Sequence, residues 1–541
     1  MTERIGQRKG QDFPIMKSVR GMRCRALGAV ALTALLAGCA VGPDFKTPTP
    51  PSAGNFWPKA AGVKPVSAEV SQAAPAPVDP DWWTEFHDPE LTALETRLAG
   101  ANLDVATAMT RFTQSRAQFS AAAANALPSL EGSGSYTHQL PSKNGVLSLF
   151  SGAAGPAFGG QGGLASGSAS TLGGFPNAFN INPFDVYQYG FDASWELDLW
   201  GQVRRQEEAA RANAQAAAEL AREALVSAEA ELARDYIDLR GTERERAIVQ
   251  RDIATFSHTV DLTKGRASAG LSADLDLANA RAELAAAQAQ LPQLTARATE
   301  LRNAVALLLG KPPGAMDQEL GTSTALPPVP PSVPVGLPSD LLRRRPDIRA
   351  AEANLHAATA NIGVAVSNFF PQISLTGSFG FQSLQLATIG QWAAQQYGVG
   401  PTITLPIFQG GRLRAELRLS RARQREAAIA YRKTVLAAFH DVSNALTDYA
   451  AEQARRERLQ AQATQDKIAF TLATQRYRSG LSSFIDVLDA ERQDLQAEQD
   501  LATSTTAVGT DLVALYKALG GGWEQTMPAT QTLAANQGGA G

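Results

Sequence analysis

Cysteine is scarce in this sequence: among 541 residues there are two, Cys24 and Cys39, and both lie near the N-terminus. This scarcity excludes a disulfide framework and a cysteine-ligated metal site. The sequence also lacks a Gly-x-Ser-x-Gly elbow and a phosphate-binding loop. Its five histidines, at positions 87, 138, 258, 356 and 440, show no metal-ligand spacing. We therefore expect no catalytic residues, no bound metal and no enzyme activity.

An excess of positive charge is absent as well. The formal net charge is −3, and residues 1–38 contain seven Lys or Arg but only two acidic residues. The rest of the chain therefore has 42 basic and 50 acidic residues, a net charge of −8. This balance argues against a nucleic-acid partner.

The N-terminus has the pattern of a secretion signal. A basic segment, 17–25, precedes an apolar run, 26–37, which is too short to span a membrane. The run ends in Leu-Ala-Gly before Cys39, which resembles the cleavage box of bacterial lipoproteins. The resemblance implies that residues 1–38 are removed and that a lipid is attached to the Cys39 sulfur. Ala40 favours the outer membrane, because Asp at that position favours inner-membrane retention; the alternative is an ordinary signal peptide with an incidental cysteine.

An internal duplication organises the mature chain. The segment 266–280 matches 476–490, with Gly270-Leu271-Ser272 aligned to Gly480-Leu481-Ser482. Each segment lies between two alanine-rich helical patterns, and the glycine ends the first of them. We therefore predict two equivalent antiparallel helical hairpins, one in each half of the chain.

The predicted order in each repeat is helix, strand, strand, long helix, hairpin tip and shorter helix. We divide the chain into a signal peptide (1–38), a lipidated, extended tether (39–80), repeat one (81–310), a Pro-rich linker (311–338), repeat two (339–520) and a flexible tail (521–541). The predicted helices are 88–127, 202–265 and 272–309 in repeat one, and 339–370, 412–478 and 482–519 in repeat two. The predicted strands are about 129–140, 186–200, 372–383 and 398–408, and the tips about 266–275 and 476–485.

The strands alternate between apolar and polar residues. Phe191, Trp195 and Leu197 share one face of the second strand, whereas Asp192 and Glu196 share the other. Four strands cannot close a pore, and open strand edges cannot face lipid. Three copies would supply twelve strands, a feasible even number. We therefore expect a mainly α fold with a trimeric, twelve-stranded membrane β-barrel and a long α-barrel; the alternative is a four-stranded sheet that caps a helical bundle.

Several stretches together resemble the outer-membrane efflux proteins, in particular the lipoprotein branch that includes the nodulation-type transporter. They are Cys39 to Phe45, Trp82 to Leu91, Leu341 to Arg349, Phe370 to Gly377, and the tip 476–490. The resemblance implies a TolC-like homotrimer in the outer membrane of a Gram-negative bacterium. It also implies a passive duct for small molecules that docks to a periplasmic adaptor and an inner-membrane RND-type pump. The alternatives are the duct of a type I protein secretion system and a non-conducting coiled-coil scaffold or adaptor.

In this family, acidic residues at the periplasmic tip form rings that narrow the pore. The matching residues are Asp486 and Asp489, which lie three apart on one helix face. Three copies would form two carboxylate rings whose mutual repulsion should raise the pKa of both groups. The alternative is that these residues favour the helix N-terminus. Asp276 is the equivalent of Asp486 in the first repeat.

Other tip residues also match family positions. Tyr477 matches a tyrosine implicated in holding the closed state, whereas the family's basic latch residue is replaced by Ser482. Arg476 and Arg478 are candidates for that missing charge. The expected adaptor-docking residues are Arg266, Gly270, Leu271, Ser272, Arg476, Gly480, Leu481 and Ser482, although a glycine after a helix is also ordinary turn chemistry.

Overall fold

The computed structural model describes residues 40–49, 72–74, 79–140, 183–270, 273–330, 332–334 and 338–526. The described residues form two compact units. The strand unit lies within 1–43, 120–207 and 362–418, and the helical unit within 44–119, 208–361 and 419–541. Cys39, Leu271 and Ser272 lie outside the described residues.

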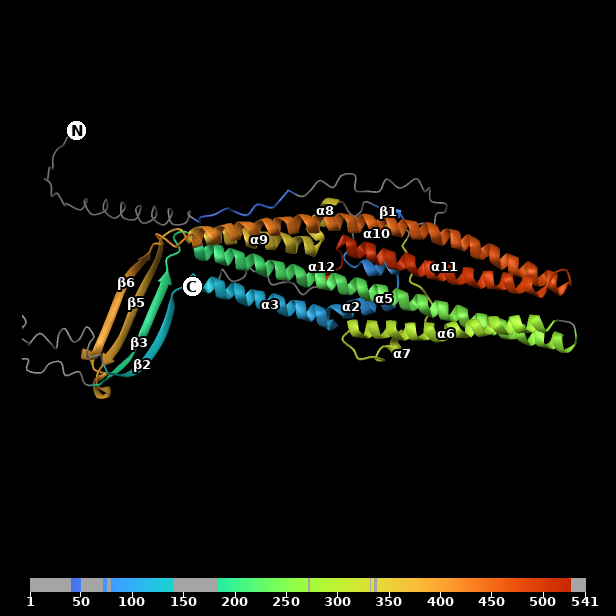
Figure 1. Ribbon diagram of the computed structural model, residues 1–541, viewed down its shortest axis with the longest axis horizontal. Helices are drawn as coiled ribbons and strands as arrows, with labels where there is room; N and C mark the ends of the chain where they lie inside the picture. Colours follow the sequence, from blue (N-terminus) through green and yellow to red (C-terminus); the bar gives the residue numbers. More distant parts are fainter. Residues whose placement is uncertain are drawn as a thin grey trace, which may run out of the picture. The chain divides into compact units, whose positions relative to one another are not determined.

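The strand unit is built on a four-stranded antiparallel sheet (Figure 1). Its strands, in spatial order, are β2 (Ser129–Gln139), β3 (Phe184–Glu196), β5 (Gln372–Ser383) and β6 (Gln395–Thr404). Two short 3-10 helices, η2 (Leu386–Thr388) and η3 (Trp392–Ala394), lie between β5 and β6. The strands from the two halves of the sequence therefore belong to one sheet.

The strand register separates apolar from polar side chains. Phe191 pairs with Phe379, and Trp195 pairs with Leu375. Because residues directly opposite one another lie on the same sheet face, these apolar pairs share one face. On the other face, Asp192 lies opposite both Glu131 and Ser378. Phe191 is 57% exposed and Phe379 is 44% exposed, so the apolar face is uncovered in the single chain.

The segment that follows Cys39 lies against the strand unit. The Val41 amide donates to the Trp200 carbonyl at 3.0 Å. A Cβ built on Gly42 would lie 2.5 Å from the Gly363 Cα, and one built on Gly201 would lie 2.8 Å from the Ala40 Cα. These approaches require glycine, so Gly42 and Gly201 allow residues 40–42 to pack here.

The helices of the structure repeat with the spacing that the duplication predicts. The long helices α5 (Gln202–Ser268) and α10 (Arg412–Arg478) each contain 67 residues. The return helices are α6 (Asp274–Leu308) and α11 (Phe484–Leu519). The helices before the strands are α3 (Leu103–Ala124) and α9 (Pro346–Ser367), with 22 residues each. Among the described residues, no helix combines the length and apolar character needed to cross a lipid bilayer.

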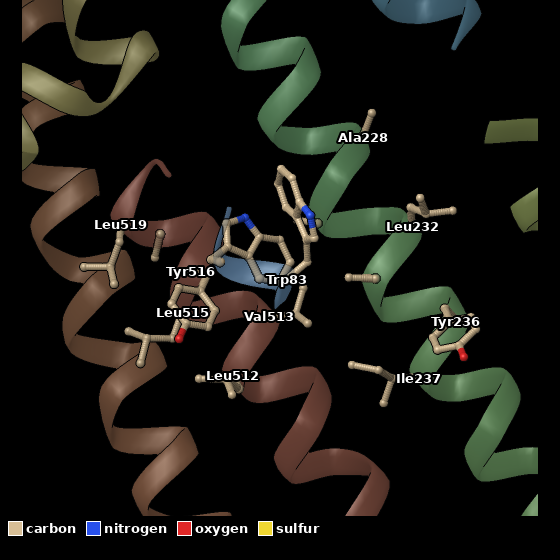
Figure 2. Close-up of a cluster of buried hydrophobic side chains, with 14 of the residues drawn as sticks. Trp83, Ala228, Leu232, Tyr236, Ile237, Leu512, Val513, Leu515, Tyr516 and Leu519 are labelled. Carbon is tan, nitrogen blue, oxygen red and sulfur yellow. The ribbon is translucent and has the colours of Figure 1, made fainter. Parts of the chain in front are cut away.

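The main core of the helical unit forms around a short aromatic segment. Helix η1 (Trp82–Phe86) places Trp82, Trp83 and Phe86 in the core, each at most 3% exposed. Trp82 stacks on Tyr516 of α11, with ring centres 5.1 Å apart. Figure 2 shows Trp83 and Tyr516 between side chains of α5 and α11. The segment thus joins helices from both repeats.

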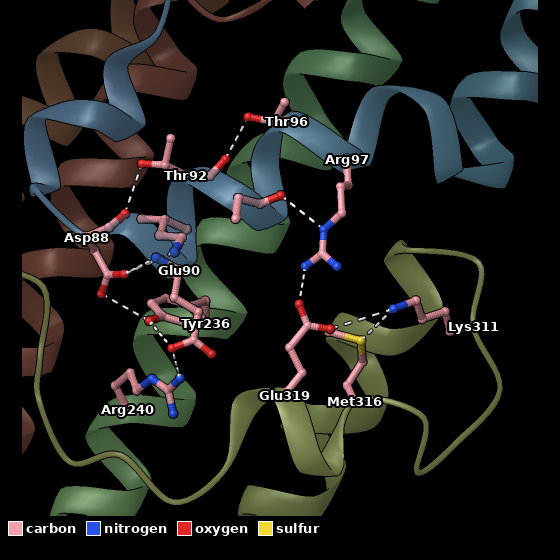
Figure 3. Close-up of polar contacts among 12 residues, drawn as sticks. Asp88, Glu90, Thr92, Thr96, Arg97, Tyr236, Arg240, Lys311, Met316 and Glu319 are labelled. Atoms are coloured by element: carbon pink, nitrogen blue, oxygen red, sulfur yellow. Dashed lines mark hydrogen bonds and ion pairs between the residues drawn. The ribbon is translucent and has the colours of Figure 1, made fainter.

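Polar contacts attach α2 (Pro89–Ala101) to α5. The Asp88 carboxylate caps α2 by accepting from the amides of Glu90 and Leu91, at 2.8 and 3.0 Å. The Tyr236 hydroxyl donates to Asp88 at 3.0 Å, and Arg240 forms an ion pair with Glu90 at 2.6 Å (Figure 3). Arg240 is 1% exposed and also donates to the Leu320 carbonyl at 2.7 Å.

Two predicted helices are each divided in the structure. The range 88–127 contains α2 and α3, which meet at Asn102. The Asn102 side-chain oxygen accepts from the amides of Asp104 and Val105, so it caps α3. The range 339–370 contains α8 (Pro338–Arg344) and α9, and the break falls before Pro346. Proline lacks an amide proton and restricts the preceding residue, so a new helix begins there.

The tether and the tail contain more structure than the sequence predicted. Residues 72–74 form β1, which pairs in parallel with β4 (Ser332–Pro334) of the Pro-rich linker. The linker also contains a short helix, α7 (Asp317–Leu320). Helix α12 (Trp523–Thr526) follows Gly520, so ordered structure extends past the predicted boundary at 521. The last strand also ends earlier than predicted, at Thr404, because Pro406 follows within two residues.

Candidate functional site at the hairpin tips

Two glycine turns close the helical hairpins. Gly270 and Gly480 both have a φ of +73°, a left-handed conformation that L side chains rarely adopt. After α10, the Gly480 amide donates to the Tyr477 carbonyl at 3.0 Å, and the Leu481 amide donates to the Arg476 carbonyl at 2.9 Å. These bonds satisfy the last carbonyls of α10, so the chain reverses in a few residues.

A small hydrophobic cluster joins the two hairpins close to their tips. Its buried members are Ala280 of α6 and Phe484 and Leu488 of α11. Val260 of α5 and Tyr477 of α10 pack against them. Side chains of all four hairpin helices therefore meet in this cluster, which is separate from the main core.

A cation–π contact lies beside this cluster. The Arg266 guanidinium is 4.9 Å from the centre of the Tyr477 ring, and that ring is 5.6 Å from the ring of Phe484. Arg266 is half-buried, and its Nε is buried without a hydrogen-bond partner among the described residues. The sequence predicted Arg266 as an adaptor-docking residue, which stays a prediction; the structure adds its contact with Tyr477 of the second hairpin.

Asp486 has a different environment from the one that the ring hypothesis predicted. Its carboxylate accepts from the Ser483 amide at 2.9 Å, and the Ser483 hydroxyl accepts from the Asp486 amide at 3.4 Å. These two bonds form a capping box at the start of α11. The hydrogen bonds with Ser483, together with the positive charge of Arg476, lower the pKa of Asp486. In the single chain the cap stabilises the charged form, whereas the predicted rise of the pKa concerns the ring of three copies and stays a prediction.

Asp489 is paired with a cation rather than free. Its carboxylate accepts from Arg492, three residues later on α11. The other end of the Arg492 guanidinium lies 3.6 Å from Glu283 of α6. Arg492 therefore connects one predicted ring residue to the first hairpin. The sequence shows that Arg492 lies three residues after Asp489, which is a spacing that allows an ion pair on a helix. Nothing in the sequence indicated the contact between Arg492 and Glu283.

The remaining predicted tip residues differ in exposure. Gly270, Arg476, Gly480 and Leu481 are exposed, and the Leu481 side chain is 71% exposed. Asp276 is half-buried in the first turn of α6. The Ser482 hydroxyl is buried and has no hydrogen-bond partner among the described residues, so Ser483 is the residue that caps α11. The capping pattern Ser-x-x-Asp could have identified Ser483 from the sequence.

Across the described ranges, no group of three or more His, Cys, Asp or Glu side chains is arranged to hold a metal ion. The acidic side chains at the tips are instead occupied by helix capping and ion pairing, as with Asp486 and Asp489.

The fold is that of an outer-membrane channel. The solved structure of the outer-membrane channel OprN matches with a TM-score of 0.77 and 33% identity, covering 90% of this chain and all of that one. TtgC of Pseudomonas putida, described as a probable efflux pump outer membrane protein, is 32% identical over 94% of this chain and 98% of its own length. Nodulation protein T of Rhizobium leguminosarum is 30% identical over 90% of this chain and 96% of its own length.

The sequence model of the outer membrane efflux proteins matches residues 96–311 and 337–521. The chain belongs to the outer membrane efflux protein family. It is a protein of the Gram-negative outer membrane, and its function is efflux. The family resemblance drawn from the sequence is thereby confirmed.

Proposed function

We propose that three copies of this chain form a passive duct, with their strands closed into one twelve-stranded barrel and their hairpins into an α-barrel. The observation that carries this proposal is the sheet of the strand unit. β2 and β6 lie at its two edges, and a chain with free edges needs partners before it can enter lipid. Edge-to-edge pairing between copies supplies those partners.

The two faces of the sheet support the same assembly. The apolar face carries exposed residues on every strand, among them Leu130, Phe191, Phe379, Tyr397 and Val399. Tyr397 and Val399 are 77% and 78% exposed, which is unusual for large apolar side chains of a soluble surface. An outer face against lipid and an inner polar face against water account for both faces.

The hairpin tips form the gate of this duct in our proposal. Asp486 and Asp489 lie on consecutive turns near the start of α11, and three copies would bring six carboxylates towards the axis. Rings of carboxylates favour cations and resist anions. Arg266 and Tyr477 hold the first hairpin against the second and so favour the closed state. The exposed turn residues, including Gly270, Gly480 and Leu481, remain available to a periplasmic adaptor.

The partners in this proposal are a periplasmic adaptor and an inner-membrane transporter of the RND type. TtgC, which matches along nearly its whole length, is described as part of an efflux pump. The sequence lacks a phosphate-binding loop, so in this proposal the transport energy comes from the pump. Small molecules, such as drugs and other toxic compounds, are the proposed cargo.

Planar-bilayer recording of the purified full-length protein tests the duct and its gate together. We expect cation-selective conductance, and the Asp486→Ala/Asp489→Ala variant should conduct several-fold more current with weaker cation preference. No conductance in either protein would contradict the duct. Conduction with unchanged selectivity in the variant would contradict the gate assignment, while native mass spectrometry reports the trimer independently.

We also propose that Cys39 carries the covalent lipid. Ala40 and Gly42 pack against Gly201 and Gly363 in the strand unit, so the segment that follows Cys39 has a defined place there. A lipid on Cys39 would then be held near the end of β3, which precedes Trp200, and near the start of β5, which follows Phe370. Palmitate labelling should disappear in Cys39→Ser and persist in Cys24→Ser; labelling that survives Cys39→Ser would contradict this assignment.

A further inference from the structure

A group of buried carboxylates, close enough to act on one another's charge, lies on helices of the two hairpins a few turns from the tip cluster. They are Asp252 on α5 and Glu491 and Asp494 on α11, with Glu283 of α6 beside them. Asp252 and Glu491 are each 2% exposed, and Asp494 is 7% exposed. Carboxylates are rarely buried to this degree unless they are paired.

Three oxygen atoms of this group have no partner. Asp252 Oδ1, Glu491 Oε1 and Asp494 Oδ1 are buried and accept no hydrogen bond from any described residue. A charged oxygen left in this state is costly, because it has lost water and gained no donor. A proton on the carboxyl removes the charge and supplies a donor.

Basic side chains lie nearby, but their ion pairs are with other acids. Arg251 of α5 pairs with Glu498 at 2.5 Å, and Lys467 of α10 approaches Glu498 at 3.6 Å. Arg492 of α11 pairs with Asp489 and approaches Glu283. Asp466 of α10 adds a further negative charge near Asp494, while Gln499 donates a hydrogen bond to Asp252.

This environment raises the pKa of both carboxyl groups, so each keeps its proton to a higher pH than an ordinary carboxyl group does. Burial, reinforced by the charges of Asp252, Glu283 and Asp494, raises the pKa of Glu491 to about 7. Burial is also the main cause that raises the pKa of Asp252 to about 6, with Glu498 and Asp494 adding to it against Arg251. Both groups therefore change charge between about pH 5.5 and pH 7.5.

We propose that Asp252 and Glu491 form a proton-operated clasp between the two hairpins, which holds them together when protonated and releases them when charged. This inference rests on the proposed gate at the tips. Charged Asp252 and Glu491 repel each other and are stabilised by hydration. Movement of α5 and α6 away from α11 reduces the repulsion and admits water.

The clasp is connected to the gate through Arg492. Arg492 lies three residues after Asp489 and directly after Glu491, and it contacts both Asp489 and Glu283. Separation of α6 from α11 breaks the contact with Glu283. Release of the clasp therefore changes the surroundings of a gate carboxylate directly.

Conductance of the full-length trimer in planar bilayers, recorded between about pH 5.5 and pH 7.5 at constant ionic strength, tests this inference. The range includes the pKa of Glu491, which is about 7, and each pH unit below that pKa lowers the charged fraction about tenfold. If the charged form opens the channel, we expect the conductance to rise about tenfold or more over this range. The Asp252→Asn/Glu491→Gln variant should keep the low conductance throughout. Asp500→Asn is the matched control, because Asp500 lies on the same helix as Glu491 and accepts a local hydrogen bond from Gln496 at 2.9 Å.

The gate carboxylates require a separate control. The Asp486→Asn/Asp489→Asn variant should conduct more than the unmodified protein at every pH. The pH at the midpoint of its conductance change should be the same as in the unmodified protein. A pH step that persists in Asp252→Asn/Glu491→Gln overturns the clasp, as does conductance that is independent of pH in the unmodified protein. The absence of any conductance, even in Asp486→Asn/Asp489→Asn, instead contradicts the proposed duct.

Infrared difference spectroscopy reports the proton itself. A carbonyl band of protonated carboxylic acids should disappear on titration between about pH 6 and pH 7.5 in the unmodified trimer, and part of this change should be lost in Asp252→Asn/Glu491→Gln. A spectrum without this titration overturns the clasp whatever the conductance shows. Native mass spectrometry of each variant establishes that the trimer is intact.

Discussion

The guanidinium of Arg266 lies over the ring of Tyr477, so the end of α5 is attached to the end of α10. The duplication makes Arg476 the equivalent of Arg266, yet the two arginines have different neighbours. Arg476 is exposed, and its charge acts on Asp486. The two hairpins are therefore alike in sequence but have different contacts at their tips.

Removal of the Arg266 side chain should loosen the gate. A cation–π contact contributes about 0.5–2 kcal/mol, so three copies of Arg266→Ala should raise the open probability several-fold. Tyr477→Phe keeps the ring and should behave like the unmodified protein, whereas Tyr477→Ala should resemble Arg266→Ala. Single-channel recordings measure these differences. An open probability equal to that of the unmodified protein in all three variants would show that the contact between Arg266 and Tyr477 does not keep the gate closed.

The two roles of Asp486, capping and charge, can be separated. Ser483→Ala removes the capping hydroxyl but keeps the carboxylate, so it should lower stability by about 1 kcal/mol and leave cation selectivity intact. Asp486→Asn keeps an acceptor for the Ser483 amide but loses the charge, so it should lower selectivity with little loss of stability. Thermal unfolding and reversal potentials measure the two effects. Loss of selectivity in Ser483→Ala would contradict this separation.

Glu95 should make the helical unit less stable as pH rises. It is fully buried, both of its carboxylate oxygens lack partners among the described residues, and burial next to Glu229 raises its pKa well above the ordinary value. A raised pKa means that the folded protein holds the proton more tightly, so stability is greatest in acid and falls as pH rises through the pKa of the folded state.

Glu95→Gln removes this titration. The variant should therefore have a higher unfolding temperature than the unmodified protein above neutral pH, and a weaker dependence on pH. Glu231→Gln, which changes an exposed residue of α5, should leave the pH dependence unchanged. The comparison is made by thermal unfolding in detergent across a pH series, and an unchanged slope in Glu95→Gln would contradict the assignment.

Two of the ion pairs in Figure 3, Arg240–Glu90 and Arg97–Glu319, should differ in their contribution to stability. Arg240 is buried, and Arg240→Ala leaves the Glu90 charge and the Leu320 carbonyl without their donor, so stability should fall by about 3 kcal/mol. The Arg97–Glu319 pair is about 40% exposed on each side, with values of 42% and 39%, so Arg97→Ala should cost less than about 1 kcal/mol. Denaturant unfolding measures both, and equal losses would refute this ranking.

Periodicity and internal repetition made much of the fold predictable. The ranges predicted for α10 and β5 coincide with the structure, because long amphipathic helices and alternating strands have strong local patterns. The breaks at Asn102 and Pro346 were missed, although both residues carry local capping or proline chemistry. The pairing of β1 with β4 was not predictable, since a three-residue strand has too few residues to show a period.

The predicted tip residues were identified by type and position, but their partners were not. The sequence by itself determined the two hairpins, the glycine turns and the alternation of the strands, because these depend on residues close to one another in the chain. Only the tertiary structure decided that Arg266 meets Tyr477, that Arg492 reaches Glu283, and that Asp252 is buried near Glu491. Those contacts join residues more than 200 positions apart, and they depend on how the two hairpins pack, which no local pattern records.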